Sequence, residues 1–249
     1  MRVVKDIYYT SFNHPRQSLD LYLPDGDNFP VVIYFHGGGI VGGSKEEPFL
    51  TDLQQRGVAV ISANYRLYPE ASYPDFIKDA AAVVAWAYKH MPEHGNITGY
   101  FVGGSSAGGY ITQMLCFDKK YLKMHNIDSD SITGYIMDAG QPTAHFNVLK
   151  ERGFDSRRVI IDETAPIYHI TAGRNYAPML IITAENDMRN RAEQTALMIS
   201  TLKHLGCEEE KIDYRCVSGC KHVEYLNKTD DQGNNMFAEM IFDFVKKFK

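Results

Sequence analysis

The chain has 249 residues, of which 44% are hydrophobic and 23% are charged, and its formal net charge is −5. This length and composition suffice for one large hydrophobic core, so we expect a single domain over residues 1–249. The acidic balance argues against nucleic acid as a partner, and the basic end Lys246-Lys247-Phe248-Lys249 is interpreted as a solvated helix terminus.

The amino-terminal residues Met1 to Asp6 lack the apolar core of a signal peptide. No window of the sequence reaches the roughly 18 apolar residues of a membrane span. We therefore expect a cytoplasmic protein with no membrane partner, although a chain that had lost a signal peptide would look the same. The sequence neither predicts nor excludes that the protein forms a homo-oligomer.

Short apolar runs alternate with helical patterns, which predicts an α/β fold with a mostly parallel sheet covered by helices on both faces. An opening antiparallel pair is predicted over Val3–Tyr9 and Leu19–Leu23. The remaining strands are predicted over Val31–Phe35, Val58–Ala63, Ile97–Val102, Ile132–Asp138, Met179–Thr183 and Ile212–Val217. Helices are predicted over Ser106–Phe117, Arg191–Leu205 and Asn235–Lys247, and around the stripe Ile77, Ala81, Val84, Tyr88 and Met91.

A glycine-rich segment, His36-Gly37-Gly38-Gly39, follows the predicted strand Val31–Phe35. Glycines allow the backbone to turn so that N–H groups point at one spot, and lipases and esterases have an oxyanion-binding loop at this place. The alternative is a flexible turn. We interpret His36 itself as structural.

The run Gly104-Ser105-Ser106-Ala107-Gly108 fits the G-x-S-x-G pattern and follows a predicted buried strand. A serine on a sharp turn between strand and helix is exposed for attack, and the flanking glycines let strand and helix approach. Ser106 is therefore the candidate nucleophile, with the N–H of Ala107 as a donor to the oxyanion. In a second frame, G-x-S-x-A, Ser105 would be the nucleophile, and an isolated match can also be an ordinary loop.

A serine nucleophile of this fold is followed in the chain by an acid and then by a histidine. Asp187 directly follows the apolar run that starts at Met179, and His222 follows the last predicted strand and a predicted turn at Ser218 and Gly219. The imidazole would accept the serine proton, and the carboxylate would orient it. The rival acids are Asp138, which also ends a predicted strand, and Glu185. Among the other histidines, His204 falls at the end of a predicted helix, and the rest precede the acid.

The four cysteines are Cys116, Cys207, Cys216 and Cys220. Cys216 and Cys220 lie close to His222 and could suggest a metal site, but their spacing matches no paired zinc motif. We therefore expect free thiols, no metal and no cofactor.

Further segments resemble the α/β-hydrolases of the hormone-sensitive-lipase-like esterase group and compact carbohydrate and feruloyl esterases. They are Tyr65-Arg66-Leu67-Tyr68-Pro69-Glu70, then Tyr73-Pro74 and Asp79, and Thr183-Ala184-Glu185-Asn186-Asp187. The resemblance runs from about Val31 to Val223 and implies a triad of Ser106, Asp187 and His222, with oxyanion donors at Gly38, Gly39 and Ala107. The chain departs from the family at Ser105, where an acidic residue is usual, and at Met188, where proline is common.

The resemblance implies a serine hydrolase that cleaves short-chain acyl esters of small molecules through an acyl-enzyme. Alternatives are an amide hydrolase with the same triad, such as an arylformamidase or a peptidase, and a binding protein that has lost its chemistry. Only 29 residues precede Pro30, so we expect a small cap or none. The insertion over residues 139–178 would form a short lid, or its aromatic residues would simply pack it down: Phe146, Leu149, Phe154, Tyr168 and Tyr176.

Overall fold

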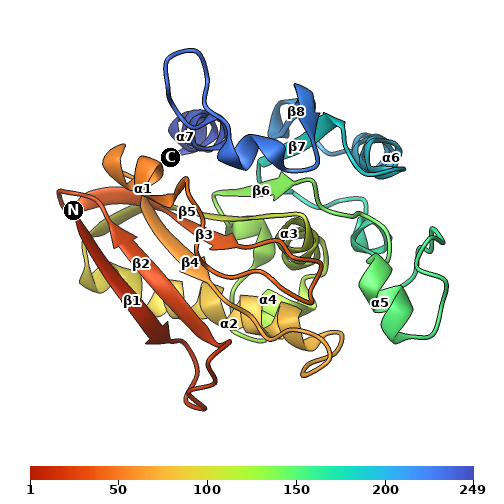
Figure 1. The fold of residues 1–249 in the computed structure, drawn as a ribbon, viewed down its shortest axis with the longest axis horizontal. Coiled ribbons are helices and arrows are strands. Elements are labelled where there is room, and N and C mark those ends of the chain that lie inside the picture. Colours follow the sequence, from red (N-terminus) through yellow and green to blue (C-terminus); the bar gives the residue numbers. More distant parts are fainter.

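The computed structural model of the protein describes residues 1–249 and contains one eight-stranded sheet (Figure 1). The strand order is β1-β2-β4-β3-β5-β6-β7-β8, and helices cover both faces, which confirms the predicted α/β-hydrolase architecture. The strands are β1 Arg2–Tyr8, β2 Ser18–Leu23, β3 Asn28–Phe35, β4 Ala59–Ala63, β5 Asn96–Ser105, β6 Gly134–Asp138, β7 Met179–Asn186 and β8 Ile212–Lys221.

The directions of the strands place the carboxyl ends of most of them at the same edge of the sheet. β1 and β2 form the predicted antiparallel pair, and β2 runs antiparallel to β4. From β4 through β3 and β5 to β8, every neighbouring pair is parallel. In open α/β sheets, ligands bind in the crevice outside the carboxyl ends of the parallel strands, so the loops after β3, β5, β7 and β8 are placed to form a site.

Seven α-helices and five short 3₁₀ turns complete the chain. The helices are α1 Leu50–Gln55, α2 Asp75–His90, α3 Ala107–Phe117, α4 Lys120–Lys123, α5 Phe146–Glu151, α6 Arg191–His204 and α7 Met236–Phe248. The 3₁₀ turns are η1 Met91–Glu93, η2 Ser129–Ser131, η3 Pro166–His169, η4 Glu209–Lys211 and η5 Glu224–Asn227. None of the helices combines the length and the apolar surface needed to cross a bilayer.

The sheet separates two hydrophobic layers because successive residues of a strand point to opposite faces. In β3, Val31, Ile33 and Phe35 belong to the larger layer of 47 buried residues, which also contains residues of α2, α3 and α6. Val32 and Tyr34 belong to the smaller layer of 22 residues, together with α1 and α7. β3 is therefore apolar on both faces, as a central parallel strand requires.

The predicted turn at Ser218 and Gly219 is wrong, because β8 continues through both residues to Lys221. The register of β7 with β8 shifts between Ala184 and Asn186, and Gly219 has a φ of 68°. This combination is a bulge inside a strand rather than the end of one. The Glu185 side chain stabilises the bulge by accepting hydrogen bonds from the Gly219 N–H and the Ser218 hydroxyl.

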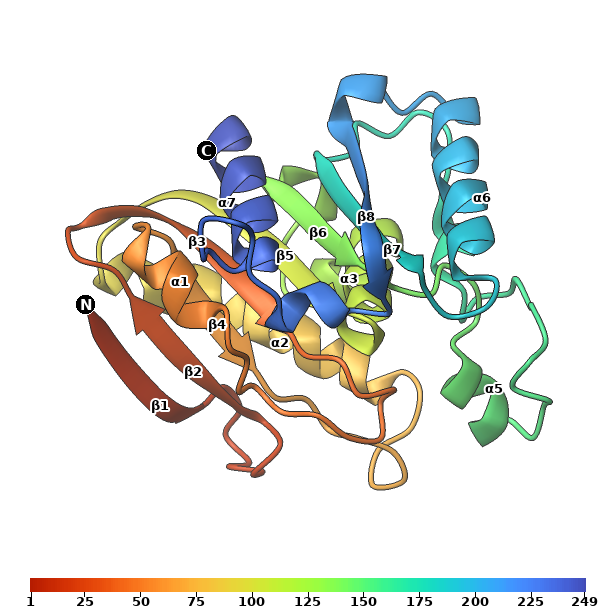
Figure 2. The same cartoon turned by 45° about the horizontal axis from the view of Figure 1, so that its top comes forward.

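The insertion over residues 139–178 contains α5 and η3, and Figure 2 shows α5 well apart from the sheet. Its aromatic and apolar side chains have different surroundings. Leu149 and Tyr176 are buried, whereas Phe154 and Tyr168 are exposed. The insertion is therefore packed down in part and leaves other side chains in solvent.

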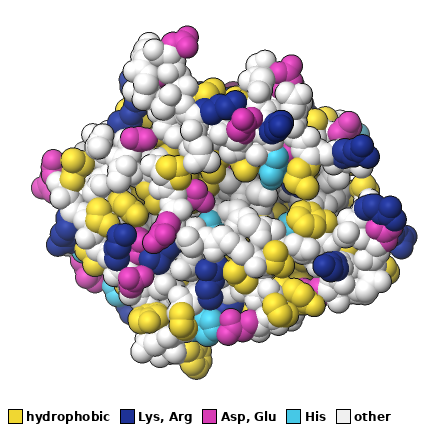
Figure 3. All heavy atoms as spheres, viewed as in Figure 1, with side chains coloured by type: hydrophobic (Ala, Val, Ile, Leu, Met, Phe, Trp, Pro, Cys, Tyr) yellow, Lys and Arg dark blue, Asp and Glu magenta, His cyan; other side chains and the backbone are white.

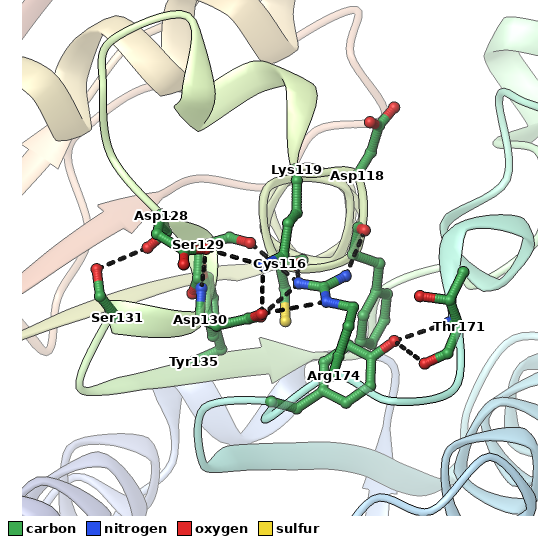
Figure 4. Close-up of polar contacts among 12 residues, drawn as sticks. Cys116, Asp118, Lys119, Asp128, Ser129, Asp130, Ser131, Tyr135, Thr171 and Arg174 are labelled. Carbon is green, nitrogen blue, oxygen red and sulfur yellow. Dashed lines mark hydrogen bonds and ion pairs between the residues drawn. The ribbon is translucent and has the colours of Figure 1, made fainter.

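Arg174 connects the end of the insertion to the C-terminal end of α3 through hydrogen bonds (Figure 4). Its guanidinium donates to the carbonyl oxygens of Phe117 at 2.7 Å and Cys116 at 2.9 Å, and it pairs with Asp130. Cationic side chains at a helix C-terminus bind carbonyl groups that have no partner within the helix. Asp130 also pairs with Lys119, so one carboxylate joins two basic residues.

Candidate active site

The loops at the carboxyl edge of the sheet bring the predicted triad together. Ser106 lies between β5 and α3, Asp187 follows β7, and His222 follows β8. Ser106 Oγ is 2.9 Å from His222 Nε2, and His222 Nδ1 is 2.6 Å from Asp187 Oδ1. One imidazole therefore contacts the candidate nucleophile with one nitrogen and a carboxylate with the other, which is the arrangement that the proposed proton transfer needs.

Ser106 occupies a sharp turn whose backbone only close packing can hold. Its φ is 55° and its ψ is −110°, a combination that L-residues rarely adopt. A Cβ on Gly108 would lie 1.9 Å from the Phe35 carbonyl oxygen, and one on Gly104 would lie 2.6 Å from the Gly108 backbone. The two glycines of the motif are thus required for β3, β5 and α3 to approach one another.

Ser105, the nucleophile of the second frame, faces the interior instead. It is 1% exposed, and its hydroxyl accepts a hydrogen bond from Tyr34 at 2.7 Å and donates one to Asp138. It has no hydrogen bond to His222. The geometry therefore favours Ser106, and a carboxylate from β6 lies beside the position where the family usually has an acidic residue.

The rival acids are both engaged elsewhere. Asp138 is fully buried and accepts hydrogen bonds from Ser105 and Tyr225, and burial raises its pKa to about 7 despite these donors. Glu185 stabilises the β8 bulge. Neither carboxylate has a hydrogen bond to His222, so Asp187 is the acid that the structure brings to the imidazole.

The register of the β7–β8 ladder places Asp187 next to His222. The last pair of this ladder is Asn186 with Lys221, and the next residue on each strand is Asp187 and His222, respectively. Burial would raise the pKa of Asp187, but the hydrogen bond and charge of His222 and the N–H groups of Met188 and Ala184 hold it below its usual value. Asp187 is therefore ionised at neutral pH.

The glycine loop lies beside the candidate nucleophile. Gly37, Gly38 and Gly39 line the same pocket as Ser106 and His222. The N–H groups of Gly38, Gly39 and Ala107 donate no hydrogen bonds to loop carbonyls or side chains, so they remain free for a ligand. The Gly39 carbonyl accepts a hydrogen bond from Asn147 Nδ2 at 2.5 Å, which ties this loop to α5.

His36 is structural, as the sequence suggested. It is 1% exposed, it stacks on Tyr65 with ring centroids 4.4 Å apart, and the Tyr65 hydroxyl donates to its carbonyl. Burial lowers its pKa to about 4. It is therefore neutral in the folded protein and does not face the pocket.

The pocket around Ser106 has a volume of about 460 Å³. Its remaining walls come from the end of β5, from the insertion and from the loops beyond β3, β7 and β8: Gly43, Glu47, Ser105, Phe146, Met188, Val223, Leu226 and Asn227. Sequence reasoning did not assign Glu47 to the site because no motif includes it. Burial raises the pKa of Glu47 to about 7, and its carboxyl has no hydrogen-bonded partner in the protein.

The cysteines do not gather around His222. Cys216 is exposed, whereas Cys220 is buried and accepts a hydrogen bond from Lys228 Nζ. The structure contains no group of three or more His, Cys, Asp or Glu side chains placed to hold a metal ion. His222 is occupied by Ser106 and Asp187.

Comparisons with known proteins agree with this architecture. The BD-FAE family model matches residues 19–148, more than half of the chain. Tuliposide A-converting enzyme 2 of Tulipa gesneriana, a chloroplastic protein, is 27% identical over 243 residues that cover 84% of this chain and 62% of the tulip protein. Esterase LipI of Mycobacterium tuberculosis is 42% identical over 96 residues, or 37% of this chain and 30% of the esterase. The chain thus spans less than two thirds of the length of these relatives.

Solved esterase structures share the fold over almost the entire chain. Esterase B of Lactobacillus rhamnosis superimposes with a TM-score of 0.80 at 18% identity, covering 99% of this chain and 86% of its own. A propionate-bound esterase, Est2, of Thermogutta terrifontis gives a TM-score of 0.75 at 22% identity, with 97% and 93% covered. Fold, family match and sequence relatives agree with the resemblance that the motifs predicted, and the chain belongs to the BD-FAE family of α/β-hydrolases.

Proposed function

We propose that the protein is a serine carboxylic ester hydrolase that acts on short-chain acyl esters through an acyl-enzyme. The observation that carries this proposal is the series of contacts from Ser106 through His222 to Asp187. The free N–H groups of the glycine loop beside Ser106 support it, and so do the esterases among the relatives.

In the first half of the proposed reaction, Ser106 Oγ attacks the ester carbonyl carbon while His222 Nε2 accepts the hydroxyl proton. The carbonyl oxygen becomes an oxyanion that accepts hydrogen bonds from backbone N–H groups, each worth roughly 10²–10³ in rate. We assign these donors to Gly38, Gly39 and Ala107. When the intermediate collapses, the alcohol takes the proton from His222 and leaves, and the acyl group stays on Ser106.

In the second half, water attacks the acyl carbon and gives its proton to the same imidazole. The serine oxygen then takes that proton as the acid is released, so the enzyme returns to its starting state. Asp187 orients the imidazole and stabilises its cationic form during both steps. The lowered pKa of Asp187 suits this role because the carboxylate must stay charged while His222 is protonated.

Two features support a short acyl group. The pocket is about 460 Å³ and is bounded by the bulky side chains of Phe146, Met188 and Leu226. The solved structure of one esterase of this fold holds propionate, a three-carbon acid. These side chains limit how far an acyl chain can extend from Ser106, which favours a short one.

Burst kinetics with 4-nitrophenyl acetate test the nucleophile. We expect Ser106→Ala to remove the burst and to lower kcat by at least about 10⁴-fold while the melting temperature stays near that of the unmodified protein. Ser105→Ala is the matched control, and it should keep the burst. A burst from Ser106→Ala and none from Ser105→Ala would reverse the assignment. Faster hydrolysis of N-formylkynurenine or peptides than of any ester would replace ester hydrolysis with amide hydrolysis.

A further inference from the structure

A second cavity, of about 650 Å³, adjoins the pocket of Ser106. Its walls come from three places: Gln141 and Phe146 around the start of α5, residues 156–159 in the loop after α5, and residues 188–191 with Gln194 at the start of α6. Phe146 and Met188 line both cavities. The two cavities therefore share a wall formed by these two side chains.

This second cavity is strongly cationic although the chain as a whole is acidic. Four of its lining residues are arginines, namely Arg157, Arg158, Arg189 and Arg191, and none is an aspartate or a glutamate. Figure 3 shows basic side chains on the side of the molecule where α5 and the loop after it lie. Such a concentration of one charge in a concave site attracts ligands of the opposite sign.

Most of these arginines are not neutralised by the protein. Arg157 pairs with Asp155, but Arg158 lies over the Phe154 ring, 5.8 Å from its centroid, and has no carboxylate partner. Arg189 is exposed and has no ion pair. Guanidinium groups bind carboxylate and phosphate with parallel hydrogen bonds, so free ones at a cavity are ready for an anion.

Arg191 is a buried arginine in the wall of the same cavity. It is only 4% exposed, and its one hydrogen bond is to the carbonyl oxygen of Ala139, at 2.9 Å. Burial lowers its pKa to about 10, although the charge of nearby Asp187 acts in the opposite direction, so part of the cost of the buried charge is not offset by the protein. An anion in the cavity would offset that cost. α6 also begins here, and the side chain of Asn190, which precedes it, forms no capping hydrogen bond, so the positive end of the helix adds to the field.

We propose that this cavity binds an anionic group of the substrate, so that the preferred ester carries a carboxylate, phosphate or sulfate beside the bond to be cleaved. The proposal rests on ester hydrolysis at Ser106 and adds the charge of the substrate to it. Arg158, Arg189 and Arg191 would hold the anion, while Phe146 and Met188 separate it from the ester carbonyl.

The test compares esters that differ mainly in charge. For the acyl half, the 4-nitrophenyl monoester of glutaric acid is compared with 4-nitrophenyl valerate; for the leaving half, 3-acetoxybenzoate is compared with 3-acetoxybenzamide. We expect kcat/KM to favour the anionic ester in one arm, which identifies the half that carries the anion. The ratio of anionic to neutral kcat/KM should fall about tenfold in the Arg158→Gln/Arg189→Gln double variant, and added salt should lower it as well.

The control is Arg215→Gln, which removes one positive charge from β8, where Arg215 pairs with Asp213. Its ratio should stay within about twofold of that of the unmodified protein, because Arg215 is partly exposed, is paired and does not line the cavity. Neutral esters favoured in both arms, or a double variant that keeps the original ratio, would overturn the inference and leave ester hydrolysis intact.

Failure of the proposed function gives a different result, in which none of the four esters is hydrolysed. Calorimetric titration with glutarate then tests the cavity without turnover. Binding to the unmodified protein that the double variant weakens about tenfold or more supports the anion site. Absence of binding to the unmodified protein, or equal binding to both proteins, rejects it.

Discussion

Ser105 and Ser106 are neighbours in the sequence but have opposite surroundings. Ser105 is a strand residue whose hydroxyl is held between Tyr34 and Asp138 in the interior. Ser106 is the first residue past the strand, and the left-handed φ of its backbone turns its hydroxyl toward His222. A shift of one residue along the chain therefore changes a serine from a buried hydrogen-bonding group into a candidate nucleophile.

The triad should act as a unit. We expect His222→Ala and Asp187→Asn each to lower kcat by roughly 10³-fold or more, and the double variant to lose far less than the product of the two losses. The reason is that the carboxylate acts only through the imidazole, 2.6 Å away. Steady-state kinetics with 4-nitrophenyl acetate on the three variants provide the measurement.

Asp138→Asn serves as the control for the acid. It changes a carboxyl on the neighbouring strand that has no hydrogen bond to His222, so its effect on kcat should be much smaller. If Asp138→Asn were the crippling change and Asp187→Asn kept most of the activity, the acid would have to be reassigned.

The buried Asp138 should also make stability depend on pH. Its pKa rises from 3.8 to about 7 in the folded protein, so the folded state holds a proton that the unfolded state releases. This contribution is fully present below about pH 4 and is lost as the pH rises to about 7, where the free energy of unfolding should have dropped by several kcal/mol, at about 1.4 kcal/mol for each pH unit.

Urea unfolding across this pH range, for the unmodified protein and Asp138→Asn, measures the contribution. Asparagine has a similar shape but does not titrate, so the decline between about pH 4 and pH 7 should become shallower in the variant. The same slope in both proteins would show that Asp138 is not the group responsible.

The secondary-structure elements β3, β5 and α3 pack against one another with almost no space between them. We expect Gly108→Ala to destabilise the protein by more than about 2 kcal/mol, because the new methyl group would lie 1.9 Å from the Phe35 carbonyl oxygen. Esterase activity should fall with it, since the strand and helix must separate at Ser106. Denaturant unfolding combined with the kinetic assay measures both effects.

Gly57→Ala is a useful control for this substitution. Gly57 has a φ of 79°, but a Cβ there would meet nothing within 4 Å, so only backbone strain of about 1 kcal/mol is expected. Gly108 lies in α3 and has no positive φ, so equal, small losses from the two variants would show that the structure relaxes around the new methyl group and that the contact with Phe35 does not require glycine.

The sequence predicted the elements that have strong local patterns. The apolar run of β3 and the glycine motif around Ser106 each determine their structure locally, so both were placed correctly. The choice between Asp138 and Asp187 could not be made from local pattern or chain order, since both lie at the end of apolar runs between Ser106 and His222, and the resemblance of Thr183–Asp187 to the acid loop of the family favoured Asp187. The ladder from Asn186 to Lys221 gives the spatial reason, and pairing between distant segments is not visible in one sequence.

Other features had no pattern to reveal them. α1 and α5 have six residues each and α4 has four, too few for a repeat of apolar positions. Glu47 lies in an irregular loop and reaches the pocket only because that loop folds back beside the glycine segment. The bulge in β8 resembled a turn because Ser218 and Gly219 are typical turn residues.

The walls of the pocket beside Ser106 determine the preference that we expect for the length of the acyl chain. We expect kcat/KM to fall at least about tenfold from 4-nitrophenyl butyrate to the dodecanoate, with no increase in rate above the solubility limit. Initial rates across an ester series measure this. A rate that rises with chain length would contradict the assignment to short esters.

Phe146→Ala tests the predicted preference for short acyl chains at a single side chain. This side chain lies in the walls of both cavities, so its truncation should join them and reduce the preference for short esters by several-fold. Phe154→Ala is the matched control, because Phe154 belongs to the same insertion but is 40% exposed and lines neither cavity. An unchanged preference in Phe146→Ala would show that the acyl chain does not reach this wall.

The pairing of β7 with β8 also determines which surface segments can change in length without separating Asp187 from His222. Asp187 and His222 are 35 residues apart in the chain, yet their distance is set by two paired strands and not by the crossover between them. The exposed part of the loop after α6 can therefore gain residues, or be opened into new termini at the exposed Gly206, while the acid and the base stay in contact. A lineage of such proteins is free to diversify this flank without losing its proton-transfer pair.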